Sequence, residues 1–234
     1  KNKTIISEGA HKEFGSHHAE VNAIEEAKKL QGISFVSFEE LTLICTLEPC
    51  NHSGKTGPCT EAIINSGIKN VIIGAEDPNP IVSGSGIKNL ISHGVAVQTG
   101  VCAELVQEQN KFFFFKNTNK RPYITIKIAS SKDRKSHLSD GDRTFITSKE
   151  SRQDVQELRA IHDAILTGGN TVVNDLPKMN ARVNFPLNQP KKILLSNKSN
   201  LDLSAEFFKD CNYEILNETD IHKIIEKYSK TDIT

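Results

Sequence analysis

Three side chains near the start of the chain have the types and surroundings of zinc ligands. His18 lies where a helical pattern begins, Cys50 follows an apolar run and a proline, and Cys59 follows a second proline at the start of another helical pattern. An imidazole and two thiolates are good ligands for Zn²⁺, and three protein ligands leave the fourth tetrahedral position open for water, as in catalytic sites. The amide dipoles of a helix N-terminus also favour the thiolate form of Cys59. These residues predict a catalytic zinc site.

One carboxylate is close enough in sequence to serve such a site. Glu20 lies two residues after His18, and both side chains can reach one centre where a helix is just beginning. Zinc lowers the pKa of a bound water, and a neighbouring carboxylate can accept and return its proton. Taken singly, a histidine, a cysteine or a first-turn glutamate is more often packed or solvated. The combination of all four residues in this order carries the prediction.

These residues need a sheet and helices to bring them together, and the apolar pattern predicts both. Apolar runs typical of strands are found at 4–6, 41–47, 71–73 and 95–97. Helical patterns alternate with these runs at 21–30, 59–66, 86–93 and 104–116. Strands that alternate with helices indicate βαβ units, and hence a parallel sheet with helices on both faces.

A polar stretch at 117–122 interrupts this pattern and is typical of a domain boundary. Beyond it the alternation restarts, with strands expected at 123–129, 164–166, 192–195 and 213–216 and helices at 149–160 and 221–228. The glycines at 168–169 are expected to end a strand in a turn. We therefore expect two α/β domains, one at 1–118 and one at 121–234.

The composition excludes several classes of protein. Lys+Arg and Asp+Glu number 29 each in 234 residues, so the net charge is zero and a broad electrostatic footprint for nucleic acid or anionic membrane is excluded. The sequence has no apolar run of the roughly 18 residues that a membrane-spanning helix needs. The N-terminus lacks an export signal, and five cysteines do not make a disulfide framework in a chain of this size. We expect a cytoplasmic protein that binds neither nucleic acid nor membrane.

The cysteine spacing separates this chain from zinc deaminases whose two thiolates form a Cys-x-x-Cys motif. Here eight residues lie between the two cysteines, in the segment TLEPCNHSGKTGPC at 46–59. Together with HAE at 18–20 and DPNP at 77–80, this segment resembles the bacterial riboflavin-biosynthesis deaminase/reductase family. The resemblance implies an α/β protein, with an N-terminal cytidine-deaminase-like three-layer domain followed by a dihydrofolate-reductase-like α/β domain. That second domain is expected to be incomplete at the C-terminus, because the family's late glutamate and Gly-Gly loop would lie beyond Thr234.

The resemblance also implies a bifunctional enzyme of riboflavin biosynthesis with two cofactors, Zn²⁺ and NADPH. The first reaction hydrolyses the exocyclic amine of a diaminopyrimidinone ribosyl phosphate, and the second reduces the ribosyl group to a ribityl chain. The residues implied for deamination are the zinc ligands His18, Cys50 and Cys59, the proton shuttle Glu20, and the substrate contacts His11, His52 and Lys55. A lysine and imidazoles suit an anionic group and the edges of a pyrimidine ring.

The second half matches the family at fewer positions. The implied substrate contacts are Arg159, Met179 and Arg182, and arginine suits phosphate recognition. The implied nicotinamide-cofactor positions are Ala129, Phe145, Thr171, Asp175 and Asn197. The chain departs from the family pattern at Lys132-Asp133-Arg134 (Leu-Asp-Gly), Arg143 (serine), Phe145 (tryptophan), Leu176 (the second aspartate of Asp-Asp-Pro) and Met179 (leucine).

Two alternatives remain open at this stage. The chain could be another zinc nucleoside or nucleic-acid deaminase, which the cysteine spacing and neutral charge disfavour. Its second half could be a non-catalytic binding or oligomerisation module, which an NADPH titration would distinguish from a reductase. The expected partner is a small phosphorylated pyrimidine, and we expect a homo-oligomer.

Overall fold

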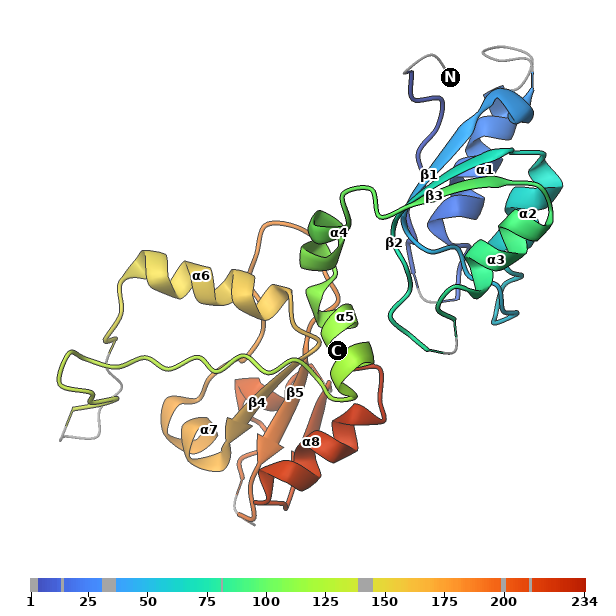
Figure 1. Cartoon of the computed structure of the whole chain (residues 1–234). Coiled ribbons are helices and arrows are strands. Elements are labelled where there is room, and N and C mark those ends of the chain that lie inside the picture. The colour runs from blue at the N-terminus through green and yellow to red at the C-terminus, as the bar shows by residue number, and fades with distance from the viewer. Residues whose placement is uncertain are drawn as a thin grey trace. The chain divides into compact units, whose positions relative to one another are not determined.

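The computed structural model describes residues 4–13, 15–30, 37–80, 82–138, 145–198, 201–210 and 212–234. The chain divides into two compact units, Lys1–Thr118 and Asn119–Thr234. Each unit is built on its own three-stranded parallel sheet (Figure 1). Across the described ranges, no helix combines the length and the apolar character that crossing a bilayer requires. Arg143, one of the departures from the family pattern, lies outside the described residues.

The sheet of the first unit has the strand order β1-β2-β3. Strand β1 (Thr42–Leu47) pairs with β2 (Asn70–Ala75), which pairs with β3 (Ala96–Thr99), and both pairs are parallel. Alternate residues face opposite sides of a strand, and the side that carries Cys45 and Ile73 is buried in the main core of this unit.

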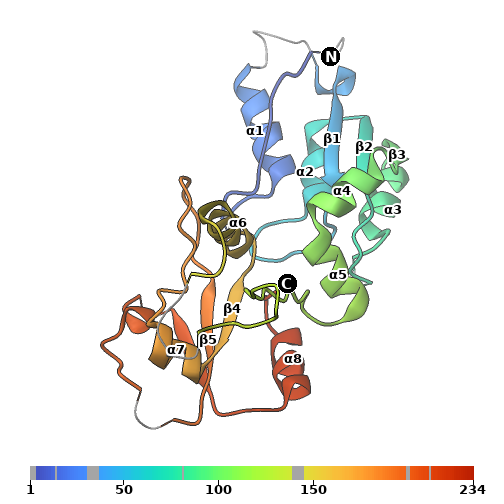
Figure 2. The same ribbon diagram turned by 90° about the vertical axis from the view of Figure 1, so that its left-hand side faces the viewer.

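Helices cover both faces of this sheet (Figures 1 and 2). Helices α1 (Ala19–Leu30), α2 (Cys59–Ser66) and α3 (Ser85–Ser92) contribute Ile24, Ile63 and Leu90 to the core against β1 and β2. Helix α4 (Ala103–Gln109) contacts β2 on the other face, where a Cβ added to Gly74 would lie 2.7 Å from a methyl group of Val106. The three-layer α/β arrangement expected for this half is therefore confirmed.

Three details of the first unit differ from the expectation. The helix expected at 104–116 is two helices, α4 and α5 (Lys111–Asn119). The break falls at Asn110, the C-cap residue of α4, whose side-chain amide and backbone N–H both donate to the carbonyl of Val106 (2.9 and 3.1 Å). Residues 4–6 form no strand; the chain there leads along α1, where the hydroxyl of Ser7 donates to the carbonyl of Ala23 (2.8 Å). A 3₁₀ helix, η1 (Phe38–Glu40), precedes β1.

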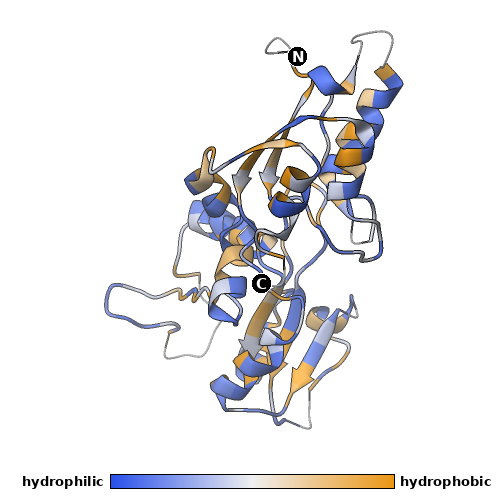
Figure 3. Ribbon diagram, turned by 45° about the vertical axis from the view of Figure 1, so that its right-hand side comes forward, coloured by the Kyte–Doolittle hydropathy of each residue, from blue (hydrophilic) through white to orange (hydrophobic). Residues whose placement is uncertain are grey.

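The second unit has the strand order β4-β5-β6, again parallel. Its elements are α6 (Lys149–Ala160), β4 (Ala164–Gly168), α7 (Gly169–Asp175), β5 (Lys191–Leu195), the 3₁₀ helix η2 (Glu206–Phe208), β6 (Tyr213–Leu216) and α8 (Ile221–Ser229). Leu194 packs with residues of α7 and η2 on one face of β5, and Ile193 packs with residues of α8 on the other. Figure 3 colours each residue by its hydropathy, and hydrophobic residues, in orange, are found on strands of both units.

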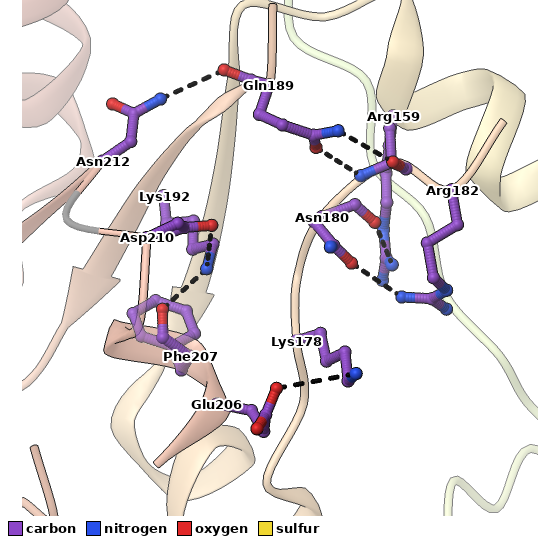
Figure 4. A network of polar contacts seen from close by, with 11 residues as sticks. Arg159, Lys178, Asn180, Arg182, Gln189, Lys192, Glu206, Phe207, Asp210 and Asn212 are labelled. Carbon is purple, nitrogen blue, oxygen red and sulfur yellow. Dashed lines mark hydrogen bonds and ion pairs between the residues drawn. The ribbon is translucent and has the colours of Figure 1, made fainter. Parts of the chain in front are cut away.

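The centre of this second sheet contains a buried cation. Lys192 on β5 is 2% exposed, forms an ion pair with Asp210 (2.8 Å) and donates to the carbonyl of Phe207 (2.7 Å), as Figure 4 shows. A buried charge is costly unless it is paired and hydrogen-bonded. Lys192 therefore fixes the segment that follows η2 against the middle strand.

Two expectations for the second unit are wrong in detail. Residues 123–129 form no strand, and Ile126 and Ile128 on this segment are 79% and 77% exposed. The glycines at 168–169 do not simply turn the chain, because Gly169 begins α7. A Cβ added to Gly169 would lie 2.6 Å from the hydroxyl of Ser196, so the absence of a side chain lets α7 start against the end of β5.

Candidate active site

The start of α1 is held in place by the segment that precedes it. The side-chain amide of Asn22 donates to the carbonyls of Ala10 (2.8 Å) and His17 (3.1 Å). A Cβ added to Gly9 would overlap the carbonyl oxygen of Ala19, so this glycine lets the chain pass directly against the helix. The first turn of α1 thereby brings His18 and Glu20 to the carboxyl end of β1.

The two cysteines meet where β1 ends and α2 begins. Cys50 follows Glu48 and Pro49, which come directly after β1, and Cys59 is the first residue of α2. The backbone N–H of Cys59 donates to the sulfur of Cys50 (3.4 Å), and the N–H of Thr60 donates to the carbonyl of Cys50 (3.2 Å). Free amides at a helix N-terminus stabilise negative charge, so this contact favours the thiolate of Cys50.

The three donor atoms form a compact group. The Nδ1 atom of His18 lies 3.5 Å from Sγ of Cys50 and 3.3 Å from Sγ of Cys59, and all three atoms lie within 4.8 Å of one another. Tetrahedral zinc with bonds of about 2.1 Å to nitrogen and 2.3 Å to sulfur places neighbouring donors roughly 3.6 Å apart. The donor set and its spacing therefore fit Zn²⁺, with the fourth position open.

Electrostatics couple the two sulfurs. Hydrogen bonding from the thiol of Cys59 lowers the pKa of Cys50 to about 5, against the opposing effect of burial. The same contact raises the pKa of Cys59 above its ordinary value, and burial raises it further. A coordinating metal ion binds cysteines as thiolates, so metal binding at this pair would release the protons that the sulfurs carry.

Glu20 lies beside this group. Its Oε2 atom is 3.6 Å from the sulfur of Cys59. Burial raises the pKa of Glu20 above the usual value for a carboxyl, and the nearby Cys50 adds to that rise. A carboxyl group placed next to a metal site and easier to protonate than usual is suited to proton transfer.

A cavity of about 1040 Å³ is lined by His18, Glu20 and Cys50 together with other residues of the first unit. Its lining includes both of the histidines expected to contact substrate, His11 and His52, which are exposed at the surface. The His11 ring meets the His18 ring edge to face at 5.3 Å between centroids. Lys55 is not part of this lining; it is exposed, and its side chain passes Gly15.

Two further side chains of the cavity wall, those of Asp77 and Cys45, are not predicted individually from the sequence. Asp77 follows β2 as Cys50 follows β1, so both come from the carboxyl ends of neighbouring parallel strands. The DPNP motif contained the signal for Asp77. Cys45 on β1 is 7% exposed, and burial raises the pKa of its thiol. Its apolar neighbours in the sequence make it look like an ordinary core residue.

The second unit brings the expected substrate residues Arg159, Met179 and Arg182 together, and Figure 4 shows the two arginines beside Asn180. Arg159 on α6 donates to the carbonyl of Asn180 (3.2 Å) and contacts the sulfur of Met179 (3.5 Å). Arg182 donates to the side-chain oxygen of the same Asn180 (2.8 Å). Burial lowers the pKa of Arg159, and the charge of Arg182 lowers it further. Two guanidinium groups held this close can bind an anion, which would relieve their repulsion.

The five expected cofactor positions are more dispersed. Thr171 on α7 and Asn197 after β5 follow the carboxyl ends of adjacent strands, since Gly168 pairs with Leu195. Asp175 ends α7 and is exposed. Ala129 belongs to the extended segment that lacks an assigned strand. Phe145 is 65% exposed and lies under the guanidinium group of Arg152, 4.6 Å from the ring centroid.

Comparison with known proteins assigns a class to this arrangement. Residues 1–75 match the family model "Cytidine and deoxycytidylate deaminase zinc-binding region", and residues 122–232 match "RibD C-terminal domain". The first match covers His18, Cys50 and Cys59, so the first unit contains a zinc-binding region of the cytidine and deoxycytidylate deaminase class.

Relatives along most of the chain define the family. The chain is 40% identical over 210 residues to the riboflavin biosynthesis protein RibD of Bacillus amyloliquefaciens, covering 90% of this chain and 55% of that protein. It is 42% identical over 207 residues to RibD of Aquifex aeolicus, covering 88% and 56%. A solved structure from Thermotoga maritima, titled a diaminohydroxyphosphoribosylaminopyrimidine deaminase/5-amino-6-(5-phosphoribosylamino)uracil reductase, is 37% identical with a TM-score of 0.81, covering 97% of this chain and 68% of that one. The chain belongs to the RibD family, and it spans about half the length of the curated relatives it matches.

Proposed function

We propose that this chain is a riboflavin-biosynthesis enzyme with two activities, deamination in residues 1–118 and reduction in residues 121–234. The deaminase substrate is a diaminopyrimidinone ribosyl phosphate, and the reductase substrate is the resulting aminouracil ribosyl phosphate. One observation carries the proposal: the donor atoms of His18, Cys50 and Cys59 lie within 4.8 Å of one another, beside a cavity lined by His18, Cys50 and Glu20. Membership of the RibD family supports both substrates.

In this mechanism the first unit binds zinc and moves protons. His18, Cys50 and Cys59 would hold Zn²⁺, which supplies Lewis acidity toward a water molecule when bound. The carboxylate of Glu20 accepts a proton from the attacking water and passes it to the adjacent ring nitrogen. A new C–O bond forms at the ring carbon and its C–N bond breaks. The departing amine receives a further proton through Glu20 and leaves as ammonia.

The walls of the cavity orient the pyrimidine. His11 and His52 offer ring nitrogens to the edges of the base, and Lys55 offers a cation to the phosphate from the exposed loop that follows. The expectation that all three contact substrate is supported most directly for the two histidines, which share the cavity with Glu20.

The second unit is proposed to bind the ribosyl phosphate and NADPH. Arg159 and Arg182 converge on Asn180 and present positive charge next to Met179, a grouping that suits a phosphorylated sugar. Thr171 and Asn197, after neighbouring strands, with Ala129, Phe145 and Asp175, are proposed as cofactor contacts. NADPH would supply the hydride that reduces the ribosyl carbon.

The decisive test is mass spectrometry of the products formed from the diaminopyrimidinone ribosyl phosphate by the zinc-loaded chain. Replacement of one amine by oxygen without NADPH supports the deaminase. The further gain of two hydrogens when NADPH is added supports the reductase. No change in the mass of the substrate under either condition contradicts the proposal. The alternative of a nucleic-acid deaminase is not favoured, because the chain has zero net charge and belongs to the RibD family.

We also propose a homo-oligomer in the cytoplasm. The exposed apolar side chains of Ile124, Ile126 and Ile128, on one extended segment of the second unit, support self-association. Cys45, Cys50, Cys59 and Cys102 are all free thiols, which supports a reducing compartment. Sedimentation equilibrium of the chain and of an Ile126→Lys variant tests the oligomer, because a monomeric parent contradicts it.

A further inference from the structure

A buried carboxylate, that of Glu48, lies two residues before the expected zinc ligand Cys50 in the sequence. Glu48 directly follows β1, is 3% exposed, and precedes Pro49 and Cys50. Its backbone N–H donates to the carbonyl of Ala75 (3.0 Å), which continues the pairing between β1 and β2. A buried acid is costly unless its oxygens accept hydrogen bonds, so the contacts of this side chain need an explanation.

The carboxylate of Glu48 accepts four backbone hydrogen bonds from one segment. Its Oε2 atom accepts from the N–H groups of Asp77 (3.2 Å) and Gly84 (2.9 Å). Its Oε1 atom accepts from those of Gly86 (2.9 Å) and Ile87 (3.3 Å). One side chain thereby fixes both ends of the connection between β2 and α3.

Two of these bonds cap helix α3. Gly84 is the N-cap residue of α3 and has no side chain to accept the free amides of the first turn. The carboxylate of Glu48 accepts them instead, and a negative charge is favourable at this end of a helix. A Cβ added to Gly86 would overlap the carbonyl oxygen of Pro49. The start of α3 therefore packs directly against the backbone next to Cys50.

The segment that Glu48 holds also supplies a wall of the cavity. Asp77 lines the cavity with His18, Glu20 and His52, and its Oδ1 atom accepts the N–H of Asn79 (2.8 Å). The hydrogen bond from the Asp77 N–H to Glu48 sets where this carboxyl group stands. Displacing Glu48 would therefore move a polar group of the cavity, whereas the three donor atoms of the metal site all lie outside the segment from 77 to 87.

We propose that Glu48 is a positioning residue of the deaminase site, which holds Asp77 in the cavity wall and α3 against the backbone of Pro49 and Cys50. This inference rests on the deaminase function proposed above. It requires a carboxylate, because the oxygens of a carboxylate only accept hydrogen bonds, whereas the amide of glutamine would point two donors at backbone N–H groups. Glu48→Gln should leave zinc binding intact and loosen the segment from 77 to 87.

The test compares Glu48→Gln in the full zinc-loaded chain with Glu61→Gln, which makes the same change at an exposed position of α2. Three quantities are measured: zinc per chain, kcat and KM for deamination, and amide hydrogen exchange of residues 77–87. We expect unchanged zinc, a KM raised about 10-fold or more with a smaller change in kcat, and faster exchange at Asp77, Gly84 and Gly86. The control should match the parent in all three.

A purely structural role would lower the fraction of folded enzyme, and therefore kcat, at unchanged KM. An active parent whose Glu48→Gln variant keeps its KM and its exchange pattern overturns the inference. A parent that does not deaminate the substrate overturns the proposed function instead, and the exchange data then still decide whether Glu48 holds Asp77. If Glu48→Gln does not fold, Glu48→Asp carries the same measurements, because it keeps the charge but shortens the side chain.

Discussion

His18 presents one nitrogen to two sulfurs, at 3.5 and 3.3 Å, and Glu20 approaches one of those sulfurs from the same turn of helix. The types of these residues are visible in the sequence, and their convergence follows from where β1 ends and where α1 and α2 begin. The roles of Glu48 and Asp77 were not predicted, because a glutamate and an aspartate near glycines and prolines look like loop residues. Burial and backbone partners reveal them.

Loss of a sulfur ligand should release the metal. We expect Cys50→Ser and Cys59→Ser to lose most of the roughly one zinc per chain that a three-ligand site holds, because a hydroxyl is a much weaker ligand than a thiolate. Metal analysis of the purified chains checks this. Cys102→Ser, which removes an exposed cysteine, should keep its zinc. Full retention in both ligand variants would show that the ligands are assigned wrongly.

Replacing the carboxylate of Glu20 should separate metal binding from chemistry. Glu20→Gln keeps the shape of the side chain but cannot accept and return a proton, so we expect normal zinc content and a kcat lower by about 10²–10⁴. Steady-state deamination kinetics provide the measurement. Glu26→Gln, on the exposed side of the same helix, serves as the control. Turnover by Glu20→Gln near the parent rate would place the proton shuttle elsewhere.

At the scale of elements, the site depends on where strands end and helices begin. Cys50 and Asp77 follow adjacent parallel strands, and α2 places an amide of its first turn on a sulfur. Asn51, the residue after Cys50, is held by a small network. The side chains of Thr60 and Asn89 both donate to its side-chain oxygen (2.8 and 2.6 Å). This network joins the start of α2 and the middle of α3 to the residue that follows Cys50.

Gly86→Ala tests the close packing of α3. Alanine in a helix normally gains about 0.5–1 kcal/mol over glycine, but here the new Cβ would overlap the carbonyl oxygen of Pro49. We expect the steric effect to win and the free energy of unfolding to fall by about 1–3 kcal/mol. Urea unfolding measures it, with Lys88→Ala on the exposed side of α3 as the control. A stabilised Gly86→Ala variant would show that this contact is not tight.

At the scale of the whole molecule, the two proposed sites lie in two units that have separate sheets and separate cores. Each proposed site is built entirely from residues of one unit. The cluster of Arg159, Met179 and Arg182 belongs to the second unit, and the zinc ligands belong to the first. Substitutions in one site should therefore leave the other site's binding constants unchanged.

Arg182→Ala provides the test of that independence. Removing a charge-assisted contact should weaken binding of the aminouracil ribosyl phosphate on the order of 10-fold. The zinc content and the deamination KM should match those of the parent. Calorimetric titration and deamination kinetics on the same samples check both statements, with the exposed Lys223→Ala on α8 as the control. A parallel change in the deamination KM would contradict separate sites.

The sequence alone determined the alternation of strands and helices in each half, the residue types of the zinc site, and the family, because these depend on local periodicity and on motifs of fixed spacing. Strand pairing depends on partners distant in the chain. Residues 123–129 have the alternating pattern of a strand but form no strand. The pair Gly168-Gly169 is typical of a turn, but Gly168 ends β4 and Gly169 begins α7 against Ser196. The burial of Glu48 and Lys192 was likewise decided by the tertiary structure, since a charged side chain is stable inside a protein only when folding brings hydrogen-bonding partners to it.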